Sequence, residues 1–362
     1  MTRTPEPLPP QGEGATRASA RQLCLYALLC VTSLLATTSL VRSGVQQSSP
    51  LPQVRQLSDK LAFWKENAAE FDVLLFGTSS LYRGIDPRVF DAETARLGAP
   101  TRSFNAGIPG LTFADGQRFL EAYLKDAPAS LRWVIVEPNT RVWLDYENVT
   151  TARVVAVHDS ANTLQVLRLL ASSRLDFDDK LTSMANHLLA AAYHAVAAGE
   201  LARSTASIPA SRTPLDEGQG FVAIEDAYPN EIAIRRGAFQ KLIESMREGI
   251  VSSDFTAVDK SPLPKAATSR FRAIAEGVPD GAEISWVIMP FFGVSKSEPF
   301  RTTFASGQLP GTLLDLEDPL ESPDGKNPRY FSDRTHLNRQ GAHHFSRQLA
   351  RMFVRRTKTG AH

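Results

Sequence analysis

The chain has 362 residues, of which 43% are hydrophobic and 22% are charged, a composition typical of a folded globular protein. Its formal net charge is +1 and its lysines and arginines form no run, so the sequence lacks the concentrated basic face that nucleic-acid binding needs. We therefore expect no nucleic-acid partner. Both cysteines, Cys24 and Cys30, lie near the amino terminus, so the rest of the chain needs neither a disulfide nor a reducing compartment.

The amino-terminal region divides into a polar tail, an apolar segment and a linker. Residues 1–20 are rich in Pro, Gly, Ser, Thr and Ala, which predicts a disordered cytoplasmic tail. Within residues 21–42, the nineteen residues 23–41 carry no charge and are bounded by arginine on both sides. A helix of that length spans about 28 Å, close to the hydrocarbon thickness of a bilayer. The sequence thus predicts one transmembrane anchor, followed by a linker at residues 43–53.

Two other interpretations of the apolar segment stay open. One is a cleaved signal peptide, although the segment is longer than the usual ~7–15-residue signal core and no A-x-A cleavage site follows it. The other is a core helix, although the segment has no polar stripe. Arg3, Arg17 and Arg21 precede it and favour a cytoplasmic amino terminus. We therefore expect a single-pass protein whose residues 54–362 form one domain on the far side of the membrane.

The domain is expected to begin with an amphipathic helix and a buried strand. Apolar residues recur at helical spacing within residues 54–69. Residues 73–76 form a continuous apolar run, typical of a parallel strand that is covered on both faces. A glycine ends this strand, and Ser79 and Ser80 follow at the carboxyl edge of the predicted sheet, at the start of a short segment that we expect to be exposed. A hydroxyl at that edge is a candidate nucleophile.

Two more strands of the predicted sheet follow in the next sixty residues. An Asp-Pro pair starts a helix over 87–97. A short strand then ends at Asn105, and the glycine-rich loop that contains Gly107 offers exposed backbone N–H groups. A helix over 112–125 precedes the apolar run 131–136, which predicts the next buried strand. The alternation of strands and helices is that of an α/β protein.

The middle of the chain, at about 148–264, has no strong strand signal and predicts a helical insertion. Its expected helices cover 162–170, 178–198 and 231–248. The segment is too long for an ordinary crossover, so we expect it to form a cap beside the crevice. His187 and His194 lie seven residues apart on the second helix, but no third ligand completes a metal site at helical spacing. We therefore expect no metal and no cofactor.

The last part of the domain returns to strands and ends in a helix. Apolar runs predict strands at 284–289 and 312–316, and residues 338–353 carry an apolar face at helical spacing. Asp333 and His336 lie just before this helix, on a loop that can fold over the crevice. The whole pattern predicts a three-layer α/β/α sandwich with a mostly parallel sheet.

These residues suit nucleophilic catalysis. A serine hydroxyl needs a neighbouring base to take its proton during attack. His336 can do so with one ring nitrogen while Asp333 holds the other nitrogen and stabilises the imidazolium. Ser80 competes with Ser79 as the nucleophile, and a purely structural role as a turn cap is also open for Ser79.

Four short blocks carry a resemblance to a known family. They are Gly77-Thr78-Ser79, Asn105-Ala106-Gly107, Glu137-Pro138-Asn139 and Asp333-Arg334-Thr335-His336. In order and spacing these blocks are similar to those of the SGNH (GDSL-type) esterases and acyltransferases. The resemblance implies an SGNH-like fold, a Ser79, Asp333 and His336 triad, and an oxyanion hole formed by the N–H groups of Ser79 and Gly107 and the side chain of Asn139.

The sequence departs from the usual family pattern at three positions. Thr78 stands where the first block has Asp, and Glu137 and Thr140 replace the ends of the third block. The relaxed first block and the anchor resemble the envelope branch of the family, which includes proteins of alginate O-acetylation and of D-alanine transfer to teichoic acids. That resemblance implies an inner-membrane protein with a periplasmic or extracytoplasmic domain.

The resemblance implies a serine-dependent O-acyltransferase, with acetyl as the expected group, that acts on an envelope or extracellular polysaccharide. Its partners would be an acyl donor, a glycan acceptor and a multi-pass membrane protein that brings the donor across the bilayer. Two alternatives stay open. One is a carbohydrate esterase or deacetylase, which would use the same acyl-enzyme with water as the acceptor. The other is a non-catalytic glycan-binding assembly subunit.

Overall fold

The structure is a computed structural model that describes residues Leu29 and Ser33 and the ranges 55–173, 175–195, 218–248, 260–293 and 297–359. The predicted tail, linker and transmembrane segment lie outside this part, apart from Leu29 and Ser33 of the segment, which are helical. Among the described residues, no helix is long and apolar enough to cross a membrane.

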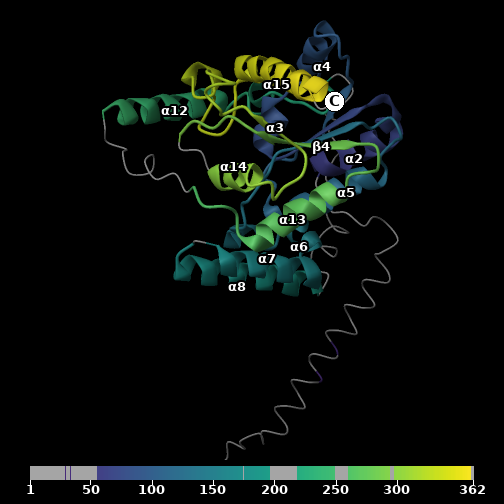
Figure 1. The fold of residues 1–362 in the computed structure, drawn as a ribbon. Coiled ribbons are helices and arrows are strands. Elements are labelled where there is room, and N and C mark those ends of the chain that lie inside the picture. Colours follow the sequence, from purple (N-terminus) through teal and green to yellow (C-terminus); the bar gives the residue numbers. More distant parts are fainter. Residues whose placement is uncertain are drawn as a thin grey trace, which may run out of the picture.

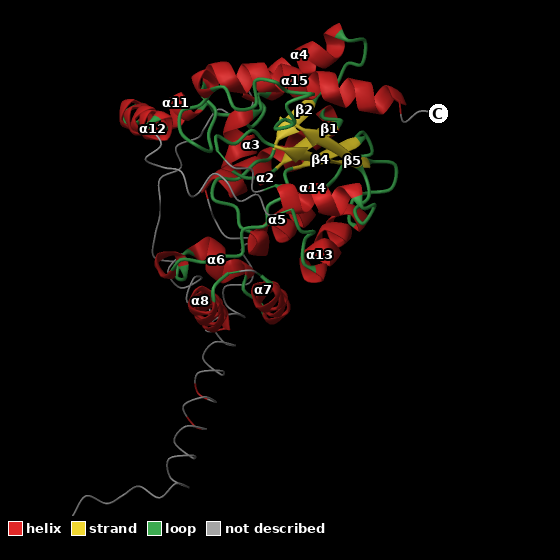
Figure 2. Ribbon diagram, turned by 60° about the vertical axis from the view of Figure 1, so that its left-hand side comes forward, coloured by secondary structure: helices red, strands yellow, loops and turns green. Residues whose placement is uncertain are grey.

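An all-parallel sheet of five strands forms the centre of the described chain (Figure 2). In chain order the strands are β1 (Val73–Phe76), β2 (Ser103–Asn105), β3 (Trp133–Val136), β4 (Glu283–Ile288) and β5 (Thr312–Asp315). Every strand that the sequence predicts is present, within about two residues at each end. The α/β class is therefore confirmed, and the sheet is entirely parallel rather than mostly so.

The strand order is β2-β1-β3-β4-β5. β1 pairs with β2 on one side and with β3 on the other, so that Leu75 lies opposite Asn105 and Ile135. The chain thus leaves β1 toward one edge and returns on the opposite side. Such a reversal is a topological switch point, and in open α/β sheets the crevice outside the carboxyl ends of the strands at this point is where ligands bind. Ser79 and Glu137 follow the two strands that flank it.

Helices cover both faces of the sheet, because successive strand residues point to opposite sides. One face carries α2 (Arg55–Asn67), α5 (Phe113–Lys125), α13 (Lys265–Glu276) and α14 (Glu298–Ala305), which pack with Leu74, Phe76 and Trp286. The other face carries α3 (Ser79–Gly84), α4 (Pro87–Arg96) and α15 (Arg339–Thr359), which pack with Val73, Leu75 and Val287. In the described part of the chain, a large apolar core therefore lies on each side of the sheet.

The helical insertion divides into two groups that lie on opposite sides of the domain (Figures 1 and 2). α6 (Ala152–Val157), α7 (Ser160–Ser172) and α8 (Phe177–Ala195) form one group, away from the sheet. α11 (Ile224–Ala227) and α12 (Ile232–Arg247) form the other, beside α15. Phe239 and Ile243 join α12 to the core under α15. Short 3-10 turns occur at Ala68–Glu70, Tyr146–Asn148 and Pro328–Tyr330.

The segment after Ser79 and Ser80 corrects one expectation. We expected it to be exposed, but it forms the short helix α3, in which Leu81, Tyr82, Arg83 and Gly84 are buried. Arg83 made this segment look exposed in the sequence. It is buried because its Nη1 donates to the carbonyl of Val222 at 2.9 Å, a partner that lies far away in the sequence. Buried arginines are rare unless such a partner exists.

Candidate active site

The turn between β1 and α3 places Ser79. Thr78 is the N-cap of α3, and its Oγ1 accepts from the Ser80 N–H at 3.2 Å. Glu137, at the end of β3, accepts from the Thr78 N–H at 2.6 Å and from the Thr78 hydroxyl at 3.0 Å. Ser79 is therefore the first residue of the helix, where backbone N–H groups have no intrahelical partner and carry partial positive charge. Two of the three positions at which the sequence departs from the SGNH pattern, Thr78 and Glu137, thus have a structural use, since they bond to each other.

Gly77 makes this turn possible. A Cβ atom at Gly77 would lie 2.5 Å from Glu137 Oε2 and 2.6 Å from Glu137 Cβ. Contacts below 3.0 Å essentially never occur for real Cβ atoms, so any side chain here would push Glu137 off Thr78. Burial raises the pKa of the Glu137 carboxyl, while the hydrogen bonds from Thr78 lower it and only partly offset the burial. The Glu137 carboxyl therefore keeps its proton to a higher pH than an exposed glutamate does.

Ser79, His336 and Asp333 form a connected triad across the carboxyl edge of the sheet. Ser79 Oγ lies 2.9 Å from His336 Nε2, and His336 Nδ1 lies 2.9 Å from both Asp333 oxygens. Asp333 Oδ1 also accepts from the backbone N–H groups of Thr335 and His336, each at 2.9 Å. The loop that carries the pair is thus shaped around the Asp333 carboxylate. Ser80, the alternative nucleophile, has no hydrogen bond to His336 in the described structure.

The electrostatics of Asp333 define the role of His336. Burial works to raise the pKa of the Asp333 carboxyl, but the hydrogen bond and charge of His336, together with the N–H donors of Thr335 and His336, outweigh it and hold the pKa well below its usual range. An ionised carboxylate can only accept, so the Nδ1 nitrogen of His336 must carry a hydrogen. In the neutral ring this leaves the lone pair on Nε2, which faces the Ser79 hydroxyl.

The other two predicted oxyanion donors are engaged elsewhere. The Gly107 N–H donates to the side chain of Asn105 at 2.9 Å. The Asn139 Nδ2 donates to the carbonyl of Leu111 at 2.6 Å, and its Oδ1 accepts from the Arg141 N–H at 2.9 Å. The structure therefore brings the triad together, whereas it uses Gly107 and Asn139 to shape the neighbouring loops. Their part in an oxyanion hole stays a prediction.

Lys60 is a buried basic side chain that we did not single out from the sequence. Its Nζ donates to the carbonyls of Asn105 and Gly107, both at 2.8 Å, and lies 3.7 Å from the centre of the Tyr82 ring. Burial, and then the charge of Arg83, lowers the pKa of Lys60 well below its ordinary value. The signal was present, since Lys60 falls within the apolar stripe of the first helix. It ties the Gly107 loop to α2.

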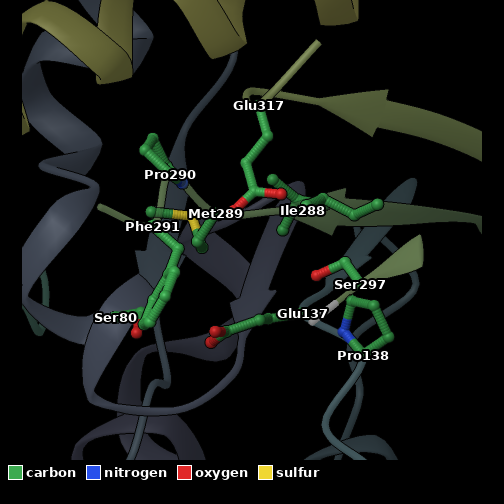
Figure 3. Close-up of a pocket in the computed structure, with 10 residues that line it drawn as sticks. Ser80, Glu137, Pro138, Ile288, Met289, Pro290, Phe291, Ser297 and Glu317 are labelled. Atoms are coloured by element: carbon green, nitrogen blue, oxygen red, sulfur yellow. The ribbon is translucent and has the colours of Figure 1, made fainter. Parts of the chain in front are cut away.

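A small cavity of about 100 Å³ lies next to Ser80, between the carboxyl ends of β3, β4 and β5 (Figure 3). Its walls are Ser80, Glu137, Pro138, Val287, Ile288, Met289, Pro290, Phe291, Ser297 and Glu317. Figure 3 shows the carboxylate of Glu137 near Ser80 and that of Glu317 near Met289. Glu317 is held by Arg301 Nη2 at 2.7 Å. The walls of the cavity are thus both polar and apolar.

The histidines of the insertion take part in packing contacts. His187 Nδ1 lies 2.8 Å from His158 Nε2, and His187 Nε2 lies 2.9 Å from the Val142 carbonyl. His194 Nδ1 lies 2.7 Å from the Val155 carbonyl. Within the described ranges, no group of three or more His, Cys, Asp or Glu side chains is arranged to hold a metal ion.

No model of a known protein family matches the chain, and no curated protein is significantly similar to it. The chemistry of the site must therefore be inferred from its own geometry. A hydroxyl within hydrogen-bond reach of a neutral imidazole, whose second nitrogen is held by an ionised carboxylate, is the arrangement that activates a serine for covalent catalysis.

Proposed function

We propose that this chain is a serine-dependent acyl-transfer enzyme of the SGNH type. The observation that carries the proposal is the hydrogen bond of 2.9 Å between Ser79 Oγ and His336 Nε2, with Asp333 bonded to the opposite ring nitrogen. The strand order, with the triad at the carboxyl edge beside the switch point, supports it. The four sequence blocks that resemble those of SGNH proteins support the assignment to that family.

The proposed reaction begins when Ser79 Oγ attacks the carbonyl carbon of an acyl ester while His336 Nε2 takes its proton. Asp333 stabilises the imidazolium that forms. The negative charge that develops on the carbonyl oxygen meets the Ser79 N–H at the positive end of α3. When the tetrahedral intermediate collapses, the leaving alcohol takes the proton from His336 and the acyl group stays on Ser79. A second hydroxyl, from a sugar or from water, then removes it by the same steps in reverse order.

The cavity supports a short acyl group. Its volume of about 100 Å³ is several times the roughly 10–15 Å³ that holds one water molecule, so it has room for a group the size of acetyl and is small for a long acyl chain. A series of 4-nitrophenyl esters tests this part of the proposal. We expect acylation to fall steeply as the acyl chain grows beyond about four carbons. Equal rates for acetyl and octanoyl esters would contradict the assignment of the cavity.

The acceptor in the proposal is an envelope or extracellular polysaccharide, and the enzyme is an inner-membrane protein with its domain in the periplasm. The predicted anchor at residues 21–42 supports the location. A single helix offers no channel for an acyl donor, so the proposal includes a multi-pass membrane partner that delivers the donor from the cytoplasm. The triad itself needs no metal and no cofactor for this chemistry.

The experiment that separates transferase from esterase follows the acyl-enzyme with time. The full-length protein is incubated with 4-nitrophenyl acetate, with and without a panel of oligosaccharides, and intact mass and sugar acetylation are measured. Faster decay of the adduct on addition of a sugar, with acetyl appearing on that sugar, would identify a transferase. Decay that ignores the sugar would identify an esterase. Absence of an adduct would favour the non-catalytic subunit.

A further inference from the structure

A side chain from the helical insertion reaches the triad. Arg235, on α12, places its Nη1 3.5 Å from Asp333 Oδ2. The same oxygen lies 2.9 Å from His336 Nδ1. Two nitrogens from distant parts of the chain therefore converge on one carboxylate oxygen, and only one of them belongs to the triad.

Several contacts hold Arg235 in this position. Its Nη2 is 3.1 Å from Oε2 of Glu231, the N-cap residue of the same helix. Its guanidinium lies 4.6 Å from the centre of the Tyr228 ring, and Arg83 of α3 lies 5.6 Å from the same ring. Arg235 is thus linked through Tyr228 to the helix that begins with Ser79.

The helix that carries Arg235 packs beside the loop that carries Asp333 and His336. The Phe239 ring packs at 4.9 Å from Phe292 and at 6.4 Å from Phe331, two residues before Asp333. The Phe292 N–H also donates to the carbonyl of Arg334, inside the loop, at 2.9 Å. The helix that carries Arg235 and the loop that carries Asp333 are therefore packed against each other through Phe239, Phe292 and Phe331.

We propose that Arg235 is a positioning residue, which holds Asp333 Oδ2 and keeps His336 in its neutral, proton-accepting form down to a lower pH. The physical reason is charge: a fixed guanidinium beside the carboxylate weakens the attraction that this carboxylate exerts on an imidazolium. The acyl-transfer site would then be complete only with the insertion docked. The proposal rests on the proposed function for its catalytic meaning, but its electrostatic content stands by itself.

The other charged groups around His336 set the direction of the expected effect. Asp333 lies on the same loop as His336 and pairs with it. Glu137 lies at the end of β3, where the charge of His336 lowers the pKa of its carboxyl against the larger effect of burial. Glu231 faces Arg235 and partly offsets its charge. Of these groups, Arg235 is the cation that contacts the triad. Removal of Arg235 should therefore make His336 easier to protonate, and removal of Glu231 should make it harder.

The test measures the pH dependence of His336 itself. Diethyl pyrocarbonate carbethoxylates neutral imidazole and not imidazolium, and the full-length protein is treated across pH 4–9. Trypsin cleavage after Arg334 and Arg339 releases residues 335–339, in which His336 is the only histidine. The fraction modified in this peptide gives a midpoint for each variant. The measurement needs no acyl donor, no acceptor and no turnover, so its outcome is independent of whether Ser79 is acylated.

We expect Arg235→Gln to raise the midpoint by about 0.5–1 pH unit, the size of a single charge at this range. Arg235→Lys, which keeps the charge, should stay near the wild-type midpoint, and Glu231→Gln should lower it. The matched control is Arg236→Gln, since Arg236 is the next residue, is half exposed and pairs with Glu225 instead. Equal midpoints in Arg235→Gln and Arg236→Gln would overturn the proposal. If Arg235→Gln fails to fold, Glu231→Gln decides, because an unchanged or raised midpoint there would also overturn it.

Discussion

Two neighbouring parts of the carboxyl edge of the sheet behave differently. In the triad, Ser79, His336 and Asp333 bond to one another. In the loops after β2 and β3, we expected the Gly107 N–H and the Asn139 amide to face a substrate. They donate hydrogen bonds to Asn105 and to the Leu111 carbonyl instead. The difference shows that side chains complementary to one another, such as Asp333 and His336, predict a site more securely than single hydrogen-bond donors, whose availability depends on the conformation of the loop that carries them.

The largest effect should come from the triad side of this comparison. Asp333→Asn would place an amide where His336 needs an acceptor, so the ring would lose its tautomer and its support. We expect acylation of Ser79 by 4-nitrophenyl acetate to slow by about ten-thousand-fold, the scale known for this exchange in serine triads. Asp324→Asn is the control, because Asp324 pairs with His344 and not with the triad. A loss smaller than tenfold would break the comparison.

A substitution in the Gly107 loop should lower the free energy of unfolding. A Cβ atom at Gly107 would lie 2.8 Å from Tyr82 Cβ and 2.9 Å from the Tyr82 Cα, so Gly107→Ala must displace α3 or the loop. We expect a loss of about 1–3 kcal/mol in the free energy of unfolding, measured in urea. Gly116→Ala is the matched control, since its Cβ would meet only Leu111 at 3.7 Å within a helix, and alanine should stabilise it slightly. Equal stability of the two variants would contradict the packing described.

The pH dependence of stability should reveal Lys60. Because its pKa is lowered in the folded protein, the unfolded chain binds a proton that the folded chain has lost at any pH between the two values. Stability therefore rises with pH in that window, by up to about 1.4 kcal/mol per pH unit, and reaches its full value above the unfolded pKa near 10.4. Urea unfolding of wild type and Lys60→Met across pH 6–10 isolates this slope. Identical slopes would show that Lys60 is not buried as described.

The smallest effect is expected at Asn139. Its amide is engaged with the Leu111 carbonyl, so we expect Asn139→Ala to slow acylation of Ser79 by less than about tenfold. A true oxyanion donor would cost about 10²–10³-fold when removed. Asn148→Ala, in a 3-10 turn of the insertion, is the control. A loss in the larger range would sharpen the comparison by showing that the loop rearranges when substrate binds.

The sequence predicts most of the sheet, because buried parallel strands such as 73–76 leave a continuous apolar run between turn residues. It also pairs Asp333 with His336, since three residues on a tight loop limit where their side chains can point. It does not predict Arg235, whose contact to Asp333 spans 98 residues of sequence. Nor does it predict the burial of α3. The Arg83 side chain of this helix can be buried because it bonds to the carbonyl of Val222, and the sequence does not show that this distant residue lies nearby.

The central claim is that Ser79 is a nucleophile activated by His336, and covalent labelling tests it most directly. The full-length protein is treated with a biotin-linked fluorophosphonate, which forms a phosphorus–oxygen bond only with an activated serine, and the adduct is mapped by peptide mass spectrometry. The account predicts labelling at Ser79 in wild type and in Ser80→Ala, and none in Ser79→Ala or His336→Gln. Labelling at Ser80, or equal labelling of wild type and His336→Gln, would contradict it.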